Sequence, residues 1–136
     1  MNESKSMKSV LFVCIENSSR SQIAQGFAKK LGLEATSAGT FPSTHINPLV
    51  IKAMLEKGID VSNNVPKSLT PEMIDRAGVV VLTDSSIEDS IPKKLRGKMK
   101  GKLVRWSIPD PQGEPIEAIR IARDEIESKV KELVPS

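Results

Sequence analysis

Residues 10–27 read VLFVCIENSSRSQIAQGF, an aliphatic run followed by a polar loop and a segment with helical periodicity. The run over residues 9–13 has the pattern of a buried strand in a parallel sheet. Apolar residues then recur at intervals of four and predict a helix over residues 19–31. The predicted strand leads directly into Cys14, and the loop that follows reaches Arg20 where the helix begins. Both side chains are therefore expected at one edge of a sheet.

The rest of the chain continues this alternation of strands and helices. Further strands are predicted over residues 34–37, 79–82 and 102–106. Further helices are predicted from Pro48 to Gly58, from Thr70 to Gly78, from Asp84 or Ser85 toward Leu95, and over residues 116–133. Such alternation predicts an α/β fold, a three-layer α/β/α arrangement around a central parallel four-stranded sheet. Ligands of these sheets bind outside the carboxyl ends of the strands, where Cys14 is expected.

Length and composition limit the possible classes of protein. A chain of 136 residues predicts a single domain over residues 1–136. Residues 1–8 are polar and charged, so we expect a flexible N-terminus rather than a signal peptide. No run approaches the roughly 18 apolar residues that a membrane span needs, which predicts a cytoplasmic protein with no membrane partner.

The distribution of charge does not indicate a nucleic-acid partner. The 20 basic and 17 acidic residues are largely interspersed and give a net charge of +3. The exception is KKLRGKMKGK at residues 93–102, which we interpret as a solvated helix end and loop in preference to a patch for an acidic partner.

The loop after the first predicted strand has the features of an anion-binding site. Successive backbone N–H groups from Glu16 to Arg20 can point into one concavity, and the helix that begins near Ser19 adds the positive end of its dipole. The planar guanidinium of Arg20 can bind two oxygens of a tetrahedral oxyanion at once. The loop therefore predicts a site for a phosphate-like ion.

The same groups act on Cys14. A single cysteine cannot form an internal disulfide, so its thiol is either a buried hydrophobic group or a reactive one. A helix N-terminus and a neighbouring guanidinium stabilise the thiolate, which is the nucleophilic form of cysteine. Asn17 is suited to left-handed backbone at the reversal of the loop. Ser18 and Ser19 are small hydrogen-bonding residues, and Ser21 could stabilise negative charge on the sulfur.

Residues 10–22, VLFVCIENSSRSQ, resemble the signature of the low-molecular-weight protein tyrosine phosphatases and of the thioredoxin-coupled arsenate reductases that share their fold. The likeness extends through residues 37–40, 58–60 and the Asp110-Pro111 pair, and covers nearly the whole chain after residue 8. The resemblance implies a low-molecular-weight phosphatase-like fold. It also implies that Cys14 attacks phosphorus or arsenic, that Arg20 holds the oxyanion and that Asp110 is the general acid. The implied substrate-binding residues are Ile15, Glu16, Asn17, Ser18, Ser19, Arg20 and Ser21.

The implied reaction requires neither a metal nor a cofactor, because amides and a guanidinium can stabilise the charge of the transferred group. The only histidine, His45, has no cysteine or acidic cluster beside it in the sequence, and we expect it in a loop.

Two positions depart from the pattern of the family. Glu16 stands where glycine is usual, and a carboxylate on the rim of an anion site repels the substrate unless it turns outward or pairs with a lysine. Asp110 is followed by Pro-Gln-Gly rather than by the tyrosines that flank an aromatic substrate in many phosphatases. This local sequence is more similar to the arsenate reductases.

Three functions are compatible with these residues, and we favour the first. It is cysteine-dependent phosphomonoester hydrolysis, with a phosphotyrosine protein or a small aryl phosphate as the substrate. The second is arsenate reduction by an external thiol or a partner protein, because residues 82–91, where those reductases carry resolving cysteines, contain no thiol. The third is a non-catalytic domain that binds anions or another protein.

Overall fold

A computed structural model describes residues 9–135 of the chain. Its four strands are β1 (Ser9–Cys14), β2 (Glu34–Gly39), β3 (Val79–Leu82) and β4 (Leu103–Arg105). Its helices are α2 (Arg20–Lys30), α3 (Pro48–Leu55), α4 (Pro71–Arg76), the 3₁₀ helix η1 (Ser85–Ser90), α5 (Lys93–Lys98) and α6 (Ile116–Leu133). The predicted sequence of strands and helices is confirmed, apart from one segment described below.

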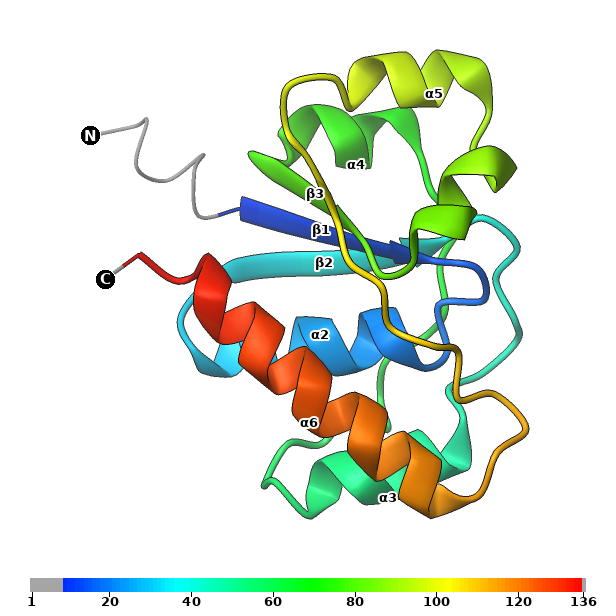
Figure 1. Ribbon diagram of the computed structural model, residues 1–136, viewed down its shortest axis with the longest axis vertical. Coiled ribbons are helices and arrows are strands. Elements are labelled where there is room, and N and C mark those ends of the chain that lie inside the picture. The colour runs from blue at the N-terminus through cyan, green and yellow to red at the C-terminus, as the bar shows by residue number, and fades with distance from the viewer. Residues whose placement is uncertain (1–8, 136) are drawn as a thin grey trace.

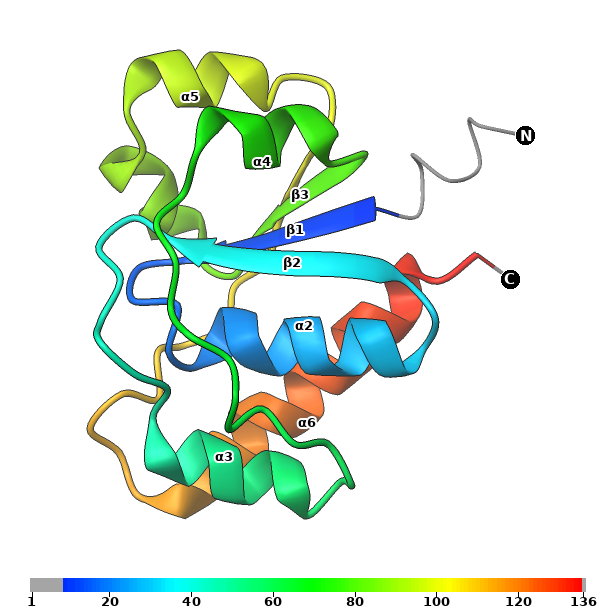
Figure 2. The ribbon, with the colours of Figure 1, turned by 180° about the vertical axis from the view of Figure 1, so that it is seen from behind.

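The four strands form one parallel sheet in the order β2-β1-β3-β4. Helices α2, α3 and α6 cover one face, and α4 and α5 cover the other (Figures 1 and 2). The predicted three-layer α/β/α fold with a four-stranded parallel sheet is therefore confirmed. The chain leaves β1 on one side toward β2 and returns on the other side to β3, so the loop after β1 lies where the strand order reverses.

Two apolar layers hold the helices against the sheet. Val10 and Phe12 of β1 face the larger layer, which contains side chains of α2, α3 and α6. Leu11 and Val13 face the layer under α4, η1 and α5. Because both faces of β1 are covered, its sequence is continuously apolar rather than alternating.

The segment predicted as one helix from Asp84 or Ser85 toward Leu95 is instead η1 followed by α5, and that prediction was wrong. Pro92 has no N–H to donate and disfavours helical backbone at the residue before it, and Ile91 has φ −91° and ψ 128°. The predicted cap at Asp84 is confirmed, because its carboxylate accepts a hydrogen bond from the N–H of Ser86 at 3.1 Å.

The basic segment over residues 93–102 forms α5 and the turn before β4. Lys98 forms an ion pair with Asp75 of α4 at 3.2 Å. Lys102 donates to the backbone carbonyls of Ile74 and Ala77 at 2.7 and 3.0 Å. Two of its cations therefore attach this segment to the end of α4.

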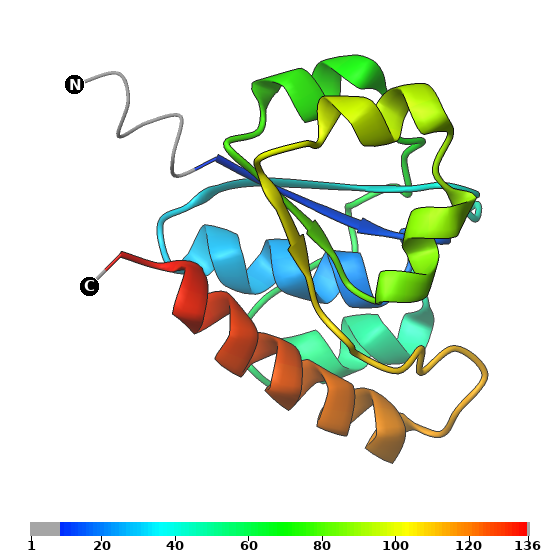
Figure 3. The same ribbon diagram turned by 45° about the horizontal axis from the view of Figure 1, so that its top comes forward.

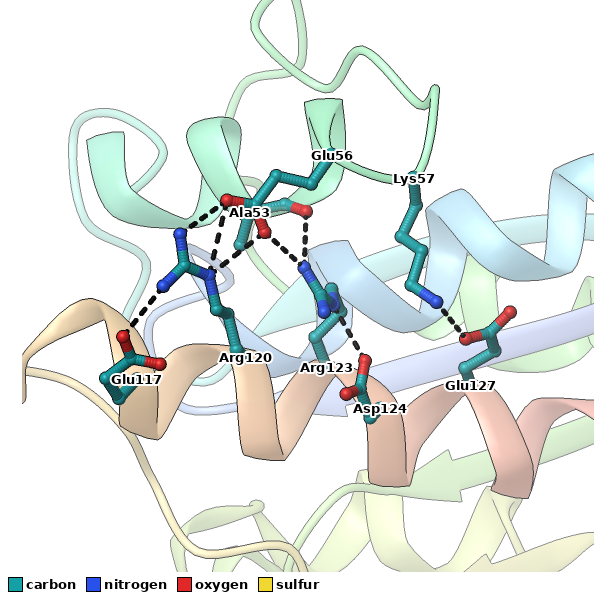
Figure 4. Close-up of polar contacts among 8 residues, drawn as sticks. All are labelled: Ala53, Glu56, Lys57, Glu117, Arg120, Arg123, Asp124 and Glu127. Carbon is teal, nitrogen blue, oxygen red and sulfur yellow. Dashed lines mark hydrogen bonds and ion pairs between the residues drawn. The ribbon is translucent and has the colours of Figure 1, made fainter.

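A cluster of ion pairs joins α3 to α6 (Figure 4). Arg123 lies on the buried side of α6 and is only 7% exposed, so its aliphatic stem covers apolar surface. Its guanidinium donates to the carbonyl of Ala53 at 2.9 Å and to Glu56 at 2.7 Å, and Arg120 binds the same carboxylate at 2.6 Å. Hydrogen bonds from Arg120 and Arg123 lower the pKa of Glu56 from 4.5 to about 2.

We expect the substitution Glu56→Gln to lower the Tm by a few degrees at neutral pH, because it removes the charge that both guanidinium groups bind. A carboxyl with a lowered pKa in the folded state stabilises the fold above its unfolded pKa of 4.5, and this contribution is lost as the pH falls toward about 2. The difference in Tm between wild type and variant should therefore shrink over that range in thermal melts. Glu132→Gln is the control, and a pH-independent difference would contradict the prediction.

Among residues 9–135, no helix is long and apolar enough to cross a membrane. The predicted flexible N-terminus, residues 1–8, lies outside the described residues.

Candidate active site

The candidate site lies at the carboxyl ends of the parallel strands. β1 ends at Cys14, β2 ends at Gly39, and the chain after β4 passes this edge before it enters α6 (Figure 3). Residues 15–19 connect β1 to α2 and form what we call the anion loop. Cys14, Glu16, Ser18, Ser19, Arg20, Asp110 and Gln112 line a pocket at this position. The three residues to which the sequence assigned chemistry, Cys14, Arg20 and Asp110, are thus brought together.

The carbonyl groups of Cys14 and of residues 15–18 accept hydrogen bonds from other parts of the chain, four of them from the segment after β2 and that of Asn17 from α2. Each accepts a hydrogen bond, in the pairs Thr40 N to Cys14 O, Phe41 N to Ile15 O, Ser43 N to Glu16 O, Asn47 N to Ser18 O, and Gln22 Nε2 to Asn17 O. Within the described chain, no protein acceptor binds the N–H groups of Glu16, Ser18 or Ser19. The loop therefore has backbone donors free for an anion, as in other loops of this kind.

Asn17 fixes the shape of the loop. Its φ is 54°, which confirms the predicted left-handed backbone, and its side chain is completely buried. The side-chain oxygen accepts from the N–H of Lys67 at 2.9 Å, and the side-chain nitrogen donates to Ser21 Oγ at 2.7 Å. One asparagine thus connects the loop both to the first turn of α2 and to the segment before α4.

The glycine at the end of β2 allows this close packing. A Cβ atom at Gly39 would collide with the carbonyl oxygen of Ile15 and lie 3.0 Å from the backbone nitrogen of Asn17. The backbone of β2 can therefore approach the anion loop only without a side chain here.

Two hydrogen bonds reach the sulfur of Cys14, which is 3% exposed. The N–H of Asn17 lies 3.2 Å from Sγ, and Ser21 Oγ lies 2.9 Å from it. Because Ser21 Oγ already accepts from Asn17, its own hydrogen is free to point at the sulfur. Both contacts can donate to a thiolate, which can only accept. The expected role of Ser21 in stabilising charge on the sulfur is consistent with this geometry.

The guanidinium of Arg20 contacts one backbone carbonyl and two carboxylates. Its side chain is 3% exposed, and Nη1 donates to the carbonyl of Ile108 at 2.9 Å. Two carboxylates lie near its guanidinium, Asp84 at 3.6 Å from Nη1 and Asp110 at 3.7 Å from Nη2. These distances leave both pairs loose, so an oxyanion bound by the loop can compete with the carboxylates for Arg20.

Asp110 lies on the rim of the pocket, and its carboxylate is 48% exposed. Its Oδ1 accepts from the N–H of Gln112 at 3.0 Å, an Asx turn that directs the other oxygen toward Arg20. The side chain of Gln112 accepts hydrogen bonds from Ser19 Oγ at 3.3 Å and Asn47 Nδ2 at 3.4 Å. Gln112 thereby connects the loop that carries Asp110 to the anion loop.

The remaining predicted site residues occupy the same loop. Ile15 and Glu16 are half-buried, and Ser18 and Ser19 are buried. Within residues 9–135, no cation lies within ion-pair distance of Glu16, so its charge remains unpaired at the rim of the pocket. His45 is exposed in the loop after β2, as expected. The described residues contain no group of three or more His, Cys, Asp or Glu side chains placed to hold a metal.

Asp84 and Gln112 belong to the pocket or contact its residues, but sequence reasoning gave neither a role at the site. Asp84 was predicted as a helix cap, which it is, yet the same carboxylate faces Arg20. Its position directly after β3 was a usable signal, because the carboxyl ends of adjacent parallel strands meet at one edge. Nothing in the local sequence distinguished Gln112 from an ordinary turn residue.

A parallel sheet whose first strand ends on a cysteine, followed by a loop with free backbone N–H groups and an arginine, is the arrangement of the low-molecular-weight phosphatase-like proteins. The chain belongs to this family, because residues 9–136 match the model described as "Low molecular weight phosphotyrosine protein phosphatase".

Relatives with different activities resemble the chain to a similar degree. The "Glutaredoxin arsenate reductase" of Synechocystis sp. is 33% identical over 131 residues, which cover 94% of this chain and 97% of that protein. The "YwlE arginine phosphatase" of Geobacillus stearothermophilus is 31% identical with a TM-score of 0.82, and the match covers 92% of this chain and 89% of that one. "An arsenate reductase in the phosphate binding state" is 32% identical with a TM-score of 0.80, covering 92% and 95%.

These similarities identify an enzyme of the phosphatase type, with arsenate reduction as the alternative activity. They do not choose between the two, because reductases and a phosphatase share about the same fraction of residues with this chain.

Proposed function

We propose that the enzyme hydrolyses phosphomonoesters, with aryl phosphates such as phosphotyrosine as the substrate class, through a phosphocysteine intermediate on Cys14. The observation that supports this most is that Cys14 is the only cysteine and lies in a pocket with Arg20 and Asp110. One thiol is sufficient for phosphoryl transfer, whereas an internal disulfide relay needs at least two.

In the first step, the Cys14 thiolate attacks phosphorus in line with the leaving oxygen. An S–P bond forms as the P–O bond breaks, and Asp110 donates a proton to the departing oxygen. The loop N–H groups and the Arg20 guanidinium bind the equatorial oxygens, where negative charge accumulates. Asp110 lies 3.7 Å from Arg20, so a phosphoryl group bound to that guanidinium is within reach of its carboxyl.

In the second step, water attacks phosphorus and Asp110 accepts a proton from it, which releases phosphate and the thiolate. The N–H of Asn17 and the hydroxyl of Ser21 donate to the sulfur and stabilise it as the leaving group. This chemistry requires Cys14 to be reduced, which is the state that thiols keep in the cytoplasm, and we propose that the enzyme acts there.

Arsenate reduction is the second candidate, because several relatives are named arsenate reductase and arsenate has nearly the shape and charge of phosphate. Reduction of arsenate to arsenite takes two electrons. Cys14 would form a sulfur–arsenic bond as one arsenate oxygen leaves as water. An external thiol would then attack the Cys14 sulfur, so that the electron pair of the sulfur–arsenic bond passes to arsenic, arsenite leaves and a mixed disulfide remains. A second external thiol would then restore Cys14.

Two assays on the purified enzyme distinguish these activities. We expect turnover of para-nitrophenyl phosphate and of a phosphotyrosine peptide. The only reductant needed is the one that keeps Cys14 reduced, because hydrolysis itself consumes no thiol. Arsenite formation from arsenate, with glutathione or a thioredoxin system as the thiol, should stay at the level of a Cys14→Ser control. Absence of aryl phosphate turnover, together with thiol-dependent arsenite formation, would contradict the proposal. Turnover of phosphoarginine but of no aryl phosphate would contradict the proposed substrate class.

A further inference from the structure

A groove of about 370 Å³ lies beside the active site, between the Asp110 loop and the first turns of α6. Its lining consists of Pro109, Asp110, Pro111, Glu114, Ala118, Ile121, Ala122 and Glu125. Asp110 lines both this groove and the pocket that contains Cys14. A molecule whose phosphoryl group lies in the anion loop can therefore extend into the groove.

The surface of the groove is apolar with acidic side chains around it. Ile121 is 69% exposed, an unusual exposure for a large aliphatic side chain, and alanines and prolines complete the apolar part. Among residues 9–135, no lysine or arginine lines it, although the full sequence carries a net charge of +3. The groove is therefore acidic although the protein as a whole is basic.

Glu125 of α6 and Glu114, which precedes that helix, differ from three neighbouring carboxylates of α6. Glu117, Asp124 and Glu127 of α6 each form ion pairs, with Arg120, Arg123 and Lys57 respectively (Figure 4). Glu114 and Glu125 are exposed, and within residues 9–135 no cation lies within 4.0 Å of either. Within residues 9–135, Glu132 of α6 also has no ion pair but does not line the groove, so Glu114 and Glu125 are the groove carboxylates left available to a cation of a ligand.

We propose that this groove binds a lysine or arginine side chain next to the phosphorylated residue of a protein substrate. The proposal rests on the proposed phosphatase function. The aliphatic stem of such a side chain would pack on Ile121, and its charged end would reach Glu114 or Glu125. The unpaired Glu16 on the other part of the rim disfavours acidic substrates and acts in the same direction.

The test compares three phosphotyrosine peptides that differ only in the two residues on each side of the phosphotyrosine, which are lysine, glutamine or glutamate. For the wild type at low ionic strength, we expect kcat/KM to be about fivefold higher for the lysine peptide than for the glutamine peptide, and lowest for the glutamate peptide. The preference for the lysine peptide should appear as a lower KM with an unchanged kcat, because the peptide's cation contacts the groove equally in the ground state and in the transition state. It should decrease with added salt.

The double variant Glu114→Gln/Glu125→Gln should reduce the preference for the lysine peptide to less than about twofold, with turnover of para-nitrophenyl phosphate unchanged. Glu132→Gln, which removes a charge from the same helix outside the groove, should keep the preference. Equal turnover of the lysine and glutamine peptides by the wild type overturns the proposal, as does a preference that survives in the double variant. If para-nitrophenyl phosphate itself is not hydrolysed, the proposed function fails and the groove proposal fails with it.

Discussion

Replacing Cys14 with serine is expected to reduce turnover of aryl phosphates by at least about 10⁴-fold. A serine hydroxyl is protonated at neutral pH and needs a base to become a nucleophile. The two groups that contact the sulfur, the N–H of Asn17 and the hydroxyl of Ser21, are both donors and cannot take its proton. The variant should therefore still bind phosphate in the loop but attack phosphorus far more slowly than the wild type.

The measurement is steady-state turnover of para-nitrophenyl phosphate, with a thermal melt to show that the variant is folded. Ser21→Ala is the matched control, because it removes the hydrogen bond at 2.9 Å but keeps the sulfur. It should lower the rate by about 10- to 100-fold and accumulate phosphoenzyme, since the sulfur is then a poorer leaving group in the second step. Turnover by Cys14→Ser within tenfold of the wild type would contradict a phosphocysteine mechanism.

Asp110→Asn is expected to have the second largest effect, and the effect should depend on the leaving group. An asparagine cannot donate a proton to the departing oxygen. Turnover of phenyl phosphate, whose leaving group needs that proton, should fall by about 10²- to 10³-fold. Turnover of 2,4-dinitrophenyl phosphate, whose leaving group does not, should fall by less than about tenfold.

Asp84→Asn provides the comparison that separates proton donation from electrostatics. Asp84 and Asp110 lie at almost the same distance from the guanidinium of Arg20, 3.6 and 3.7 Å, so either substitution replaces one carboxyl group near it by an amide. Only Asp110 is proposed to donate a proton to the leaving group. The rates of Asp84→Asn with the two esters should therefore change by the same factor, and an equal change in Asp110→Asn would exclude it as the general acid.

Local sequence was sufficient for most of the fold. The apolar run of β1 is buried on both faces, and this continuous pattern identifies a strand of a parallel sheet without any knowledge of its neighbours. Helix ends were also predictable from local sequence, because each depends on residues within one turn. Examples are the caps at Thr70 and Asp84 and the end of α2. The break at Pro92 is local as well, because the proline has no N–H to donate and disfavours helical backbone at Ile91, but one helix was predicted across it.

The candidate site was predictable mainly where it is contiguous in sequence. Residues 14–21 lie in one strand, one loop and one turn of helix, so their mutual geometry follows from a local motif. Asp110 could be joined to them through resemblance to a family and through its place after the last predicted strand, at the same edge of the sheet as Cys14. The role of Gln112, which bridges Ser19 and Asn47, had no sequence signal, because each contact spans more than 60 residues.

The sequence by itself determined that a cysteine at the end of a buried strand is followed by a loop whose backbone, serines and arginine suit a tetrahedral anion. It also determined that no second thiol is available for an internal relay. Only the tertiary structure decided which carboxylates face Arg20, and that an acidic groove adjoins the site. The physical reason is the strand order β2-β1-β3-β4, which places the loops after β1, β3 and β4 at one edge of the sheet although they are far apart in the chain.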